Sequence, residues 1–162
     1  MKTLNLGLIL KNATIQHKII GVIKHFAKGY FKKMSIELHW IDCLAYMEDL
    51  KNVDLVVTSP PYDNMRTYDN SLEWNFDIFK KVANSLTKSL KEGGVICWIV
   101  NDETINGSET GSSFRQALYF KDICGLNLHD TMIWNKEAFS AVGSLKTRYA
   151  PVFEYIFVCI LL

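Results

Sequence analysis

The sequence has no Cys-x-x-Cys pair, no histidines at metal-ligand spacing from its cysteines, and no apolar stretch of transmembrane length. Its cysteines lie far apart, in or beside apolar runs, which predicts reduced core residues rather than disulfides or zinc ligands. The apolar run near the N-terminus is too short and too poorly flanked for a signal peptide. We therefore expect a cytoplasmic protein with no bound metal and no membrane anchor. The cysteines are Cys43, Cys97, Cys124 and Cys159.

Acidic residues are missing from residues 1–33, which hold seven lysines. Three interpretations of this segment compete: a helix that covers the core, an arm that touches phosphate or a membrane surface, or a leader upstream of a domain that begins near Met34. We favour the first or the third, and expect a basic helical extension over 1–33 followed by one domain over 34–162. The apolar residues that recur at helical spacing are Ile15, Ile19, Val22, Ile23, Phe26 and Tyr30.

The remaining chain is rich enough in apolar residues for a core, since 49% of the sequence is hydrophobic. Strand-like apolar runs alternate with helical patterns, which predicts an α/β fold with a doubly wound, mostly parallel sheet. The net charge of +1 neither demands nor excludes a nucleic-acid partner. We expect strands over 36–41, 53–58, 95–100, 128–134 and 152–160, the last two as a candidate antiparallel edge, and helices over 43–51, 75–90 and 114–123.

Three connections complete this outline. The segment 63–70 is too rich in asparagine and aspartate to be helical and reads as a polar loop. Gly93 and Gly94 are expected to cap the helix over 75–90 at its C-terminal end. The segment 101–113 is rich in glycine, serine and threonine and is expected to be a loop.

The most informative stretch is 54–62, where a short apolar, β-branched run stops on two prolines. The run is typical of a buried parallel strand. Pro60 forces Ser59 out of helical geometry, and because neither proline has an N–H, the sheet cannot continue through them. The result is a rigid turn at the carboxyl end of a strand, where open α/β sheets place their ligands.

This turn resembles the catalytic motif of the S-adenosylmethionine-dependent DNA amino-methyltransferases, which methylate cytosine N4 or adenine N6. The family motif reads Ser/Asp/Asn-Pro-Pro-Tyr/Phe, and here it is Ser59-Pro60-Pro61-Tyr62. The resemblance implies a catalytic role for all four residues. The Ser59 side chain and the Pro60 carbonyl would accept hydrogen bonds from the exocyclic amine, and Tyr62 would stack on a base flipped out of the DNA duplex.

The resemblance extends over residues 35–158. It includes Gly93-Gly94 before a strand, the stretch 134–136, and Arg148-Tyr149 followed by the strand 153–158. It implies S-adenosyl-L-methionine as cofactor and double-stranded DNA as partner. Asp42 matches the family's acidic residue near the cofactor adenine. An equally good interpretation is that Asp42 is the N-cap of the helix that follows it. The residues assigned to the cofactor are Asp42 and Thr58, and those assigned to DNA are Asn64, Arg66 and Arg148.

Family members with this motif near the amino end carry a Phe-x-Gly-x-Gly cofactor loop near the carboxyl end, which is a circular permutation of the usual order. The sequence contains no Gly-x-Gly. We therefore expect a Rossmann-like methyltransferase sheet that is circularly permuted and incomplete at the C-terminus, with 34–162 as a partial catalytic domain from a truncated gene product.

Ser59 favours cytosine N4 over adenine N6, since the family's adenine enzymes more often have aspartate there. Two alternatives to a DNA amino-methyltransferase remain open. One is a catalytically inactive fragment that binds DNA or a partner chain. The other is an amino-methyltransferase for protein glutamine or RNA bases, although these usually have asparagine at the first motif position.

Overall fold

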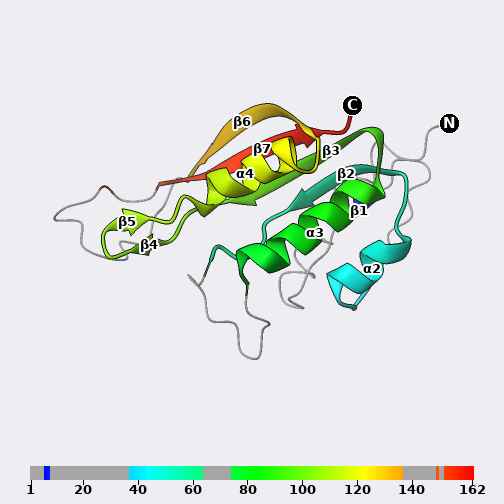
Figure 1. Ribbon diagram of the computed structural model, residues 1–162, viewed down its shortest axis with the longest axis horizontal. Coiled ribbons are helices and arrows are strands. Elements are labelled where there is room, and N and C mark those ends of the chain that lie inside the picture. The colour runs from blue at the N-terminus through cyan, green and yellow to red at the C-terminus, as the bar shows by residue number, and fades with distance from the viewer. Residues whose placement is uncertain (1–5, 8–36, 64–73, 137–148, 150–151) are drawn as a thin grey trace, which may run out of the picture.

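The computed structural model describes residues 6–7, 37–63, 74–136, 149 and 152–162. Within them, a five-stranded sheet has the order β1-β2-β3-β7-β6 (Figure 1). The strands are Leu6–Gly7 (β1), Val53–Thr58 (β2), Leu90–Val100 (β3), Asn127–Asn135 (β6) and Phe153–Ile160 (β7).

The sheet is mixed, and one strand runs against the others. The pairs β1–β2 and β2–β3 are parallel, whereas β7 is antiparallel to both β3 and β6. β6 therefore points the same way as β1, β2 and β3. The predicted α/β class with a mostly parallel sheet is confirmed, and so is the antiparallel pairing of the last two strands.

Among the described residues, three helices accompany this sheet: Cys43–Asp49 (α2), Phe76–Ser89 (α3) and Ser112–Asp122 (α4). Asn75 caps α3, because its side chain accepts hydrogen bonds from the backbone N–H groups of Asp77 and Ile78. The apolar stripe of α3 faces the sheet, as its period predicts. The buried side chains on that stripe are Phe79, Val82, Ala83 and Leu86.

The core lies between the sheet and the helices α3 and α4. Trp98 of β3 is at its centre, with its ring 5.6 Å from Phe79 of α3 and 5.2 Å from Phe120 of α4 between centroids. The indole N–H donates to Gln116 Oε1 over 2.8 Å, so the polar atom of this buried tryptophan is satisfied. Trp134 of β6, by contrast, is 51% exposed.

The predicted strand over 36–41 is not formed in its described part, 37–41. Residues 37–41 have no regular structure, and Leu38, Trp40 and Ile41 are all more than half exposed. The reason lies in the sheet: the outer edge of β2 is taken by Leu6–Gly7, which pairs with Leu55 and Val56. A strand-like pattern without a partner strand does not make a strand.

The two glycines do not cap the helix. α3 ends at Ser89, and Leu90 already belongs to β3. Gly93 has a φ of +73°, and the register shift between Val53 and Leu55 shows that residues 91–94 bulge out of the β2–β3 ladder. A Cβ on Gly94 would lie 2.8 Å from the Val53 carbonyl oxygen, so only glycine fits this close approach.

The predicted loop over 101–113 contains a small hairpin. Thr104–Ile105 (β4) pairs with Ser108–Glu109 (β5) across Asn106-Gly107, both at positive φ. Two consecutive residues at positive φ form a type I′ turn, for which Asn-Gly is the strongest sequence signal. α4 then begins at Ser112, two residues earlier than expected.

All four cysteines are free; Cys159 is buried in the core, whereas Cys43, Cys97 and Cys124 are half-buried. Burial raises the pKa of the Cys159 thiol to about 12, so this side chain is a neutral part of the core. None of the helices in the described part of the chain combines the length and the apolar character that crossing a bilayer requires. Of the helical extension expected over 1–33, the structure describes only Leu6–Gly7, which form the short strand β1; the rest of that segment, and the domain boundary near residue 34, lie outside the described residues.

Candidate active site

Segments that are distant in sequence meet at one edge of the sheet. β2 and β3 end there, β7 begins there because it runs the other way, and β6 ends beside it. The pairing of Thr58 with Trp98 and of Trp134 with Glu154 fixes this alignment. The chain from Ser59 onward therefore leaves the sheet next to the start of β7.

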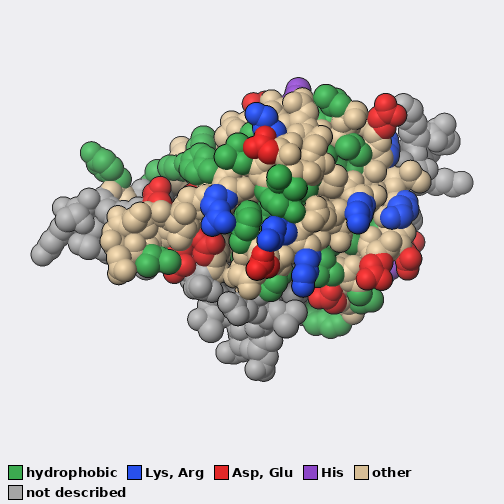
Figure 2. Space-filling model, viewed as in Figure 1, with side chains coloured by type: hydrophobic (Ala, Val, Ile, Leu, Met, Phe, Trp, Pro, Cys, Tyr) green, Lys and Arg blue, Asp and Glu red, His purple; other side chains and the backbone are tan. Residues whose placement is uncertain are grey.

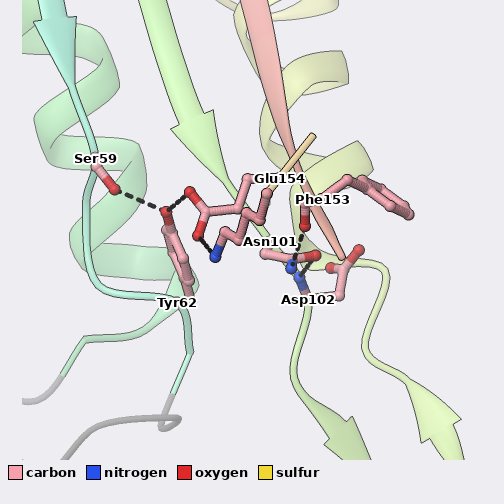
Figure 3. A network of polar contacts seen from close by, with 7 residues as sticks. Ser59, Tyr62, Asn101, Asp102, Phe153 and Glu154 are labelled. Carbon is pink, nitrogen blue, oxygen red and sulfur yellow. Dashed lines mark hydrogen bonds and ion pairs between the residues drawn. The ribbon is translucent and has the colours of Figure 1, made fainter. Parts of the chain in front are cut away.

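The motif turn holds its two polar side chains together. The Ser59 and Tyr62 hydroxyl oxygens are 2.8 Å apart (Figure 3). Ser59 is exposed, whereas Pro60, Pro61 and Tyr62 are half-buried, and the Tyr62 ring packs against the core. The two prolines stiffen the backbone between these side chains, so the turn presents Ser59 at a fixed position.

Glu154 is the site residue that sequence reasoning missed. It is only 7% exposed, and its Oε2 accepts a hydrogen bond of 2.8 Å from the Tyr62 hydroxyl (Figure 3). Its Oε1 forms an ion pair with Lys136, the residue that follows β6. A glutamate within an otherwise apolar strand was the available signal, because buried carboxylates are rare unless they are paired.

A second polar network anchors the residue after the motif. Asp63 Oδ2 accepts hydrogen bonds of 2.7 Å from Thr110 and Ser112, at the start of α4. Asp102, which follows β3, accepts from the Ser113 backbone N–H over 2.8 Å. Asp102 thus supplies the cap that the α4 N-terminus lacks, since Gly111 has no side chain to offer.

The two residues assigned to the cofactor have different places in the fold. Asp42 is the N-cap of α2, and its Oδ1 accepts from the backbone N–H groups of Leu44 and Ala45. The N-cap alternative is therefore confirmed. Thr58 is the last residue of β2 and is half-buried. The residues assigned to DNA, Asn64, Arg66 and Arg148, lie outside the described residues.

The chain belongs to the N6/N4 DNA methylase family. The family model described as DNA methylase matches residues 53–160, which span both the motif turn and Glu154. The geometry agrees with this membership, because the motif follows a parallel strand at the carboxyl edge of the sheet. The described residues contain no cluster of histidine, cysteine or acidic side chains that could hold a metal ion.

Among curated proteins, the orphan methyltransferase M.BamHII of Bacillus amyloliquefaciens is 54% identical over 106 residues. This match covers 65% of the chain and only 37% of M.BamHII. Among solved structures, the cytosine-N4-specific PvuII DNA methyltransferase matches with a TM-score of 0.61 and 22% identity, over 74% of this chain and 46% of that one. The TTHA0409 protein of Thermus thermophilus gives a TM-score of 0.58 and 20% identity, over 78% and 54%. At these identities, the two structures establish the fold alone.

Proposed function

We propose that this chain carries the base-binding part of a DNA methyltransferase that transfers a methyl group from S-adenosyl-L-methionine to the exocyclic amine of a flipped base. Cytosine N4 is the favoured target and adenine N6 the alternative. The observation that carries the proposal is the Ser59–Tyr62 turn, held at the carboxyl edge of the sheet by Glu154 in a chain that belongs to the DNA methylase family.

The side chains at this edge suit an amine substrate. An exocyclic amine conjugated to its ring is a poor nucleophile, and acceptors placed on its two hydrogens return electron density to the nitrogen. Ser59 Oγ and the Pro60 carbonyl oxygen can serve as these acceptors, because both are on the rigid turn. The Tyr62 ring can stack on the extruded base, which offsets part of the cost of unstacking it from the duplex.

The cofactor fits the described residues in part. Asp42 uses Oδ1 to cap α2, and its exposed Oδ2 forms no hydrogen bond among the described residues, so it can accept from the adenine amino group. Thr58 ends β2 immediately before the motif turn and contributes a hydroxyl. When bound, S-adenosyl-L-methionine supplies the electrophilic methyl group. This chain's part is to hold the amine in place.

Asn64, Arg66 and Arg148 remain the proposed contacts to DNA. Asn64 and Arg66 directly follow the motif, so their side chains can reach phosphate or a base edge near the flipped nucleotide. Figure 2 shows the helix-bearing face, where basic side chains are interspersed with acidic ones. This mixture of charges favours DNA binding at the carboxyl edge rather than across α3 and α4.

The test is transfer of labelled methyl from S-adenosyl-L-methionine to duplex DNA, followed by nucleoside analysis. We expect label in N4-methylcytosine, and loss of that label in Ser59→Ala and Tyr62→Ala. Ser108→Ala is the matched control, since this serine lies on the exposed β5 strand. Label in N6-methyladenine would change the target base. Label that survives Ser59→Ala would refute the role of the turn.

A further inference from the structure

The hydrogen bonds around Tyr62 form a chain whose direction can be worked out. Tyr62 lies between Ser59 and Glu154, with 2.8 Å to each, and Lys136 closes the far end by pairing with the other oxygen of Glu154. An ionised carboxylate can only accept hydrogen bonds. Tyr62 has one proton and must give it to Glu154. The Tyr62 oxygen then accepts a hydrogen bond from the Ser59 hydroxyl. The only hydroxyl proton of Ser59 is therefore donated to another protein group.

This direction decides what Ser59 can offer to a substrate. A hydroxyl has one donor hydrogen and two acceptor lone pairs. With its hydrogen directed at Tyr62, Ser59 presents lone pairs alone to the space above the turn. Ser59 is exposed and forms no other hydrogen bond among the described residues. An N–H group can be received there, whereas a carbonyl oxygen meets only lone pairs and is repelled.

We propose that Glu154 and Lys136 are positioning residues that select for a base with an exocyclic amine. They act through Tyr62 on the direction of the Ser59 hydroxyl, and do not touch the base themselves. The inference rests on the proposed function and deepens it. It predicts that cytosine and adenine are accepted at this site, while bases with a carbonyl group at the same position are rejected by the acceptor-only serine.

Glu154→Gln is the informative substitution because Lys136 fixes how the new amide must sit. The ammonium group attracts the amide oxygen, so the NH₂ group turns toward Tyr62. Tyr62 must then accept from Gln, give its own proton to Ser59, and leave Ser59 pointing its hydrogen outward. After this reversal, the Ser59 hydroxyl hydrogen faces the hydrogens of the amine and repels them. Adding Lys136→Met frees the amide to rotate, so its oxygen can again accept from Tyr62.

The first experiment follows the Tyr62 hydroxyl proton by NMR in protein labelled at tyrosine Cζ, with the signal assigned by its loss in Tyr62→Phe. In the unmutated protein, and equally in Ser59→Ala, we expect slow exchange with solvent, since Glu154 holds the proton. In Glu154→Gln, exchange should become fast only when Ser59→Ala is added. Fast exchange in Ser59→Ala alone would overturn the proposal. This readout does not depend on methyl transfer.

The second experiment measures methyl transfer from S-adenosyl-L-methionine to DNA. Glu154→Gln should lower kcat about tenfold or more, as expected for a lost hydrogen bond to the reacting group, with KM for the cofactor unchanged. The Lys136→Met/Glu154→Gln double variant should recover much of this loss, and Glu48→Gln on exposed α2 should behave as the unmutated chain. A double variant worse than the single one would indicate a merely structural ion pair and refute the proposal. Failure of every variant, including the unmutated chain, to transfer methyl would instead refute the proposed function.

Discussion

The core beneath Trp98 and the edge around Tyr62 each contain a hydrogen-bonded polar pair, but only the pair at the edge is connected to the surface. Trp98 and Gln116 are 18 residues apart, and their hydrogen bond is buried, with each partner serving the other. Tyr62 and Glu154 are 92 residues apart, and their hydrogen bond continues to Ser59, which is exposed. The first pair is closed inside the core, while the second leads out to the surface.

This difference separates stability from function. A closed pair within the core can do nothing but hold the fold, so its loss should appear in the free energy of unfolding. A network that leads to an exposed hydroxyl carries the influence of a buried carboxylate to the place where a ligand binds. Substitutions in the core should therefore affect stability most, and substitutions at the edge should affect methyl transfer most.

The largest stability effect is expected from Phe79→Ala. Phe79 is fully buried and its ring contacts Trp98 and Phe120, so removing it leaves a cavity and costs about 3–5 kcal/mol. Phe114→Ala is the comparison, because Phe114 is 47% exposed and should cost about 1 kcal/mol. Urea unfolding of both variants measures the difference. Equal losses would mean that the core is not centred under Trp98.

Gln116→Met tests the closed pair. It keeps the volume of the side chain but leaves the buried Trp98 N–H without an acceptor, at a cost of about 1–3 kcal/mol in the free energy of unfolding. In the double variant with Trp98→Phe no donor is left unpaired, so the double loss should be smaller than the sum of the single losses. Strict additivity of the two losses would show that the pair contributes nothing.

Tyr62→Phe tests the open network and should cost less stability than Gln116→Met. Glu154 keeps its ion pair with Lys136, and water can reach this edge, so we expect a loss of about 1 kcal/mol. Methyl transfer should fall much further than stability, because Ser59 loses the partner that takes its proton. A stability loss as large as that of Phe79→Ala would place Tyr62 in the core and blur the distinction between the two regions.

The core was largely predictable because it depends on local patterns. The strand 53–58 and the helix over 75–90 were recognised from the period of their apolar residues, and the structure has Val53–Thr58 and Phe76–Ser89. The predictions were wrong where a strand depends on its neighbouring strand in the sheet more than on its own apolar pattern. The run 36–41 is apolar enough for a strand, but Leu6–Gly7 occupies the position beside β2. The Asn106-Gly107 turn was a missed local signal.

Of the site at the carboxyl edge of the sheet, only the motif turn was predictable from the sequence. The motif turn could be read from its two prolines, because they restrict the backbone locally. The link from Tyr62 to Glu154 could not, since it depends on β7 being inserted antiparallel beside β3. Local patterns do not contain that pairing. A glutamate in an apolar strand indicates that some partner exists, but the fold alone determines which one.

The smallest effect is expected at the surface pair of Asp77 and Lys80 in the first turn of α3, which gives a baseline for both regions. The hydrogen bond and charge of Lys80 hold the pKa of Asp77 below its usual value. Because this pKa is lower in the folded chain than in the unfolded one, the contribution is present above a pH of about 4 and is lost as the pH falls below it. Asp77→Asn should therefore unfold slightly more easily than the unmutated chain at pH 7 in urea titrations, and this difference should shrink as the pH falls below about 4. Added salt should shrink the difference at pH 7, since the pair is exposed. A difference that persists at low pH would trace the effect to helix capping at Asn75 rather than to charge.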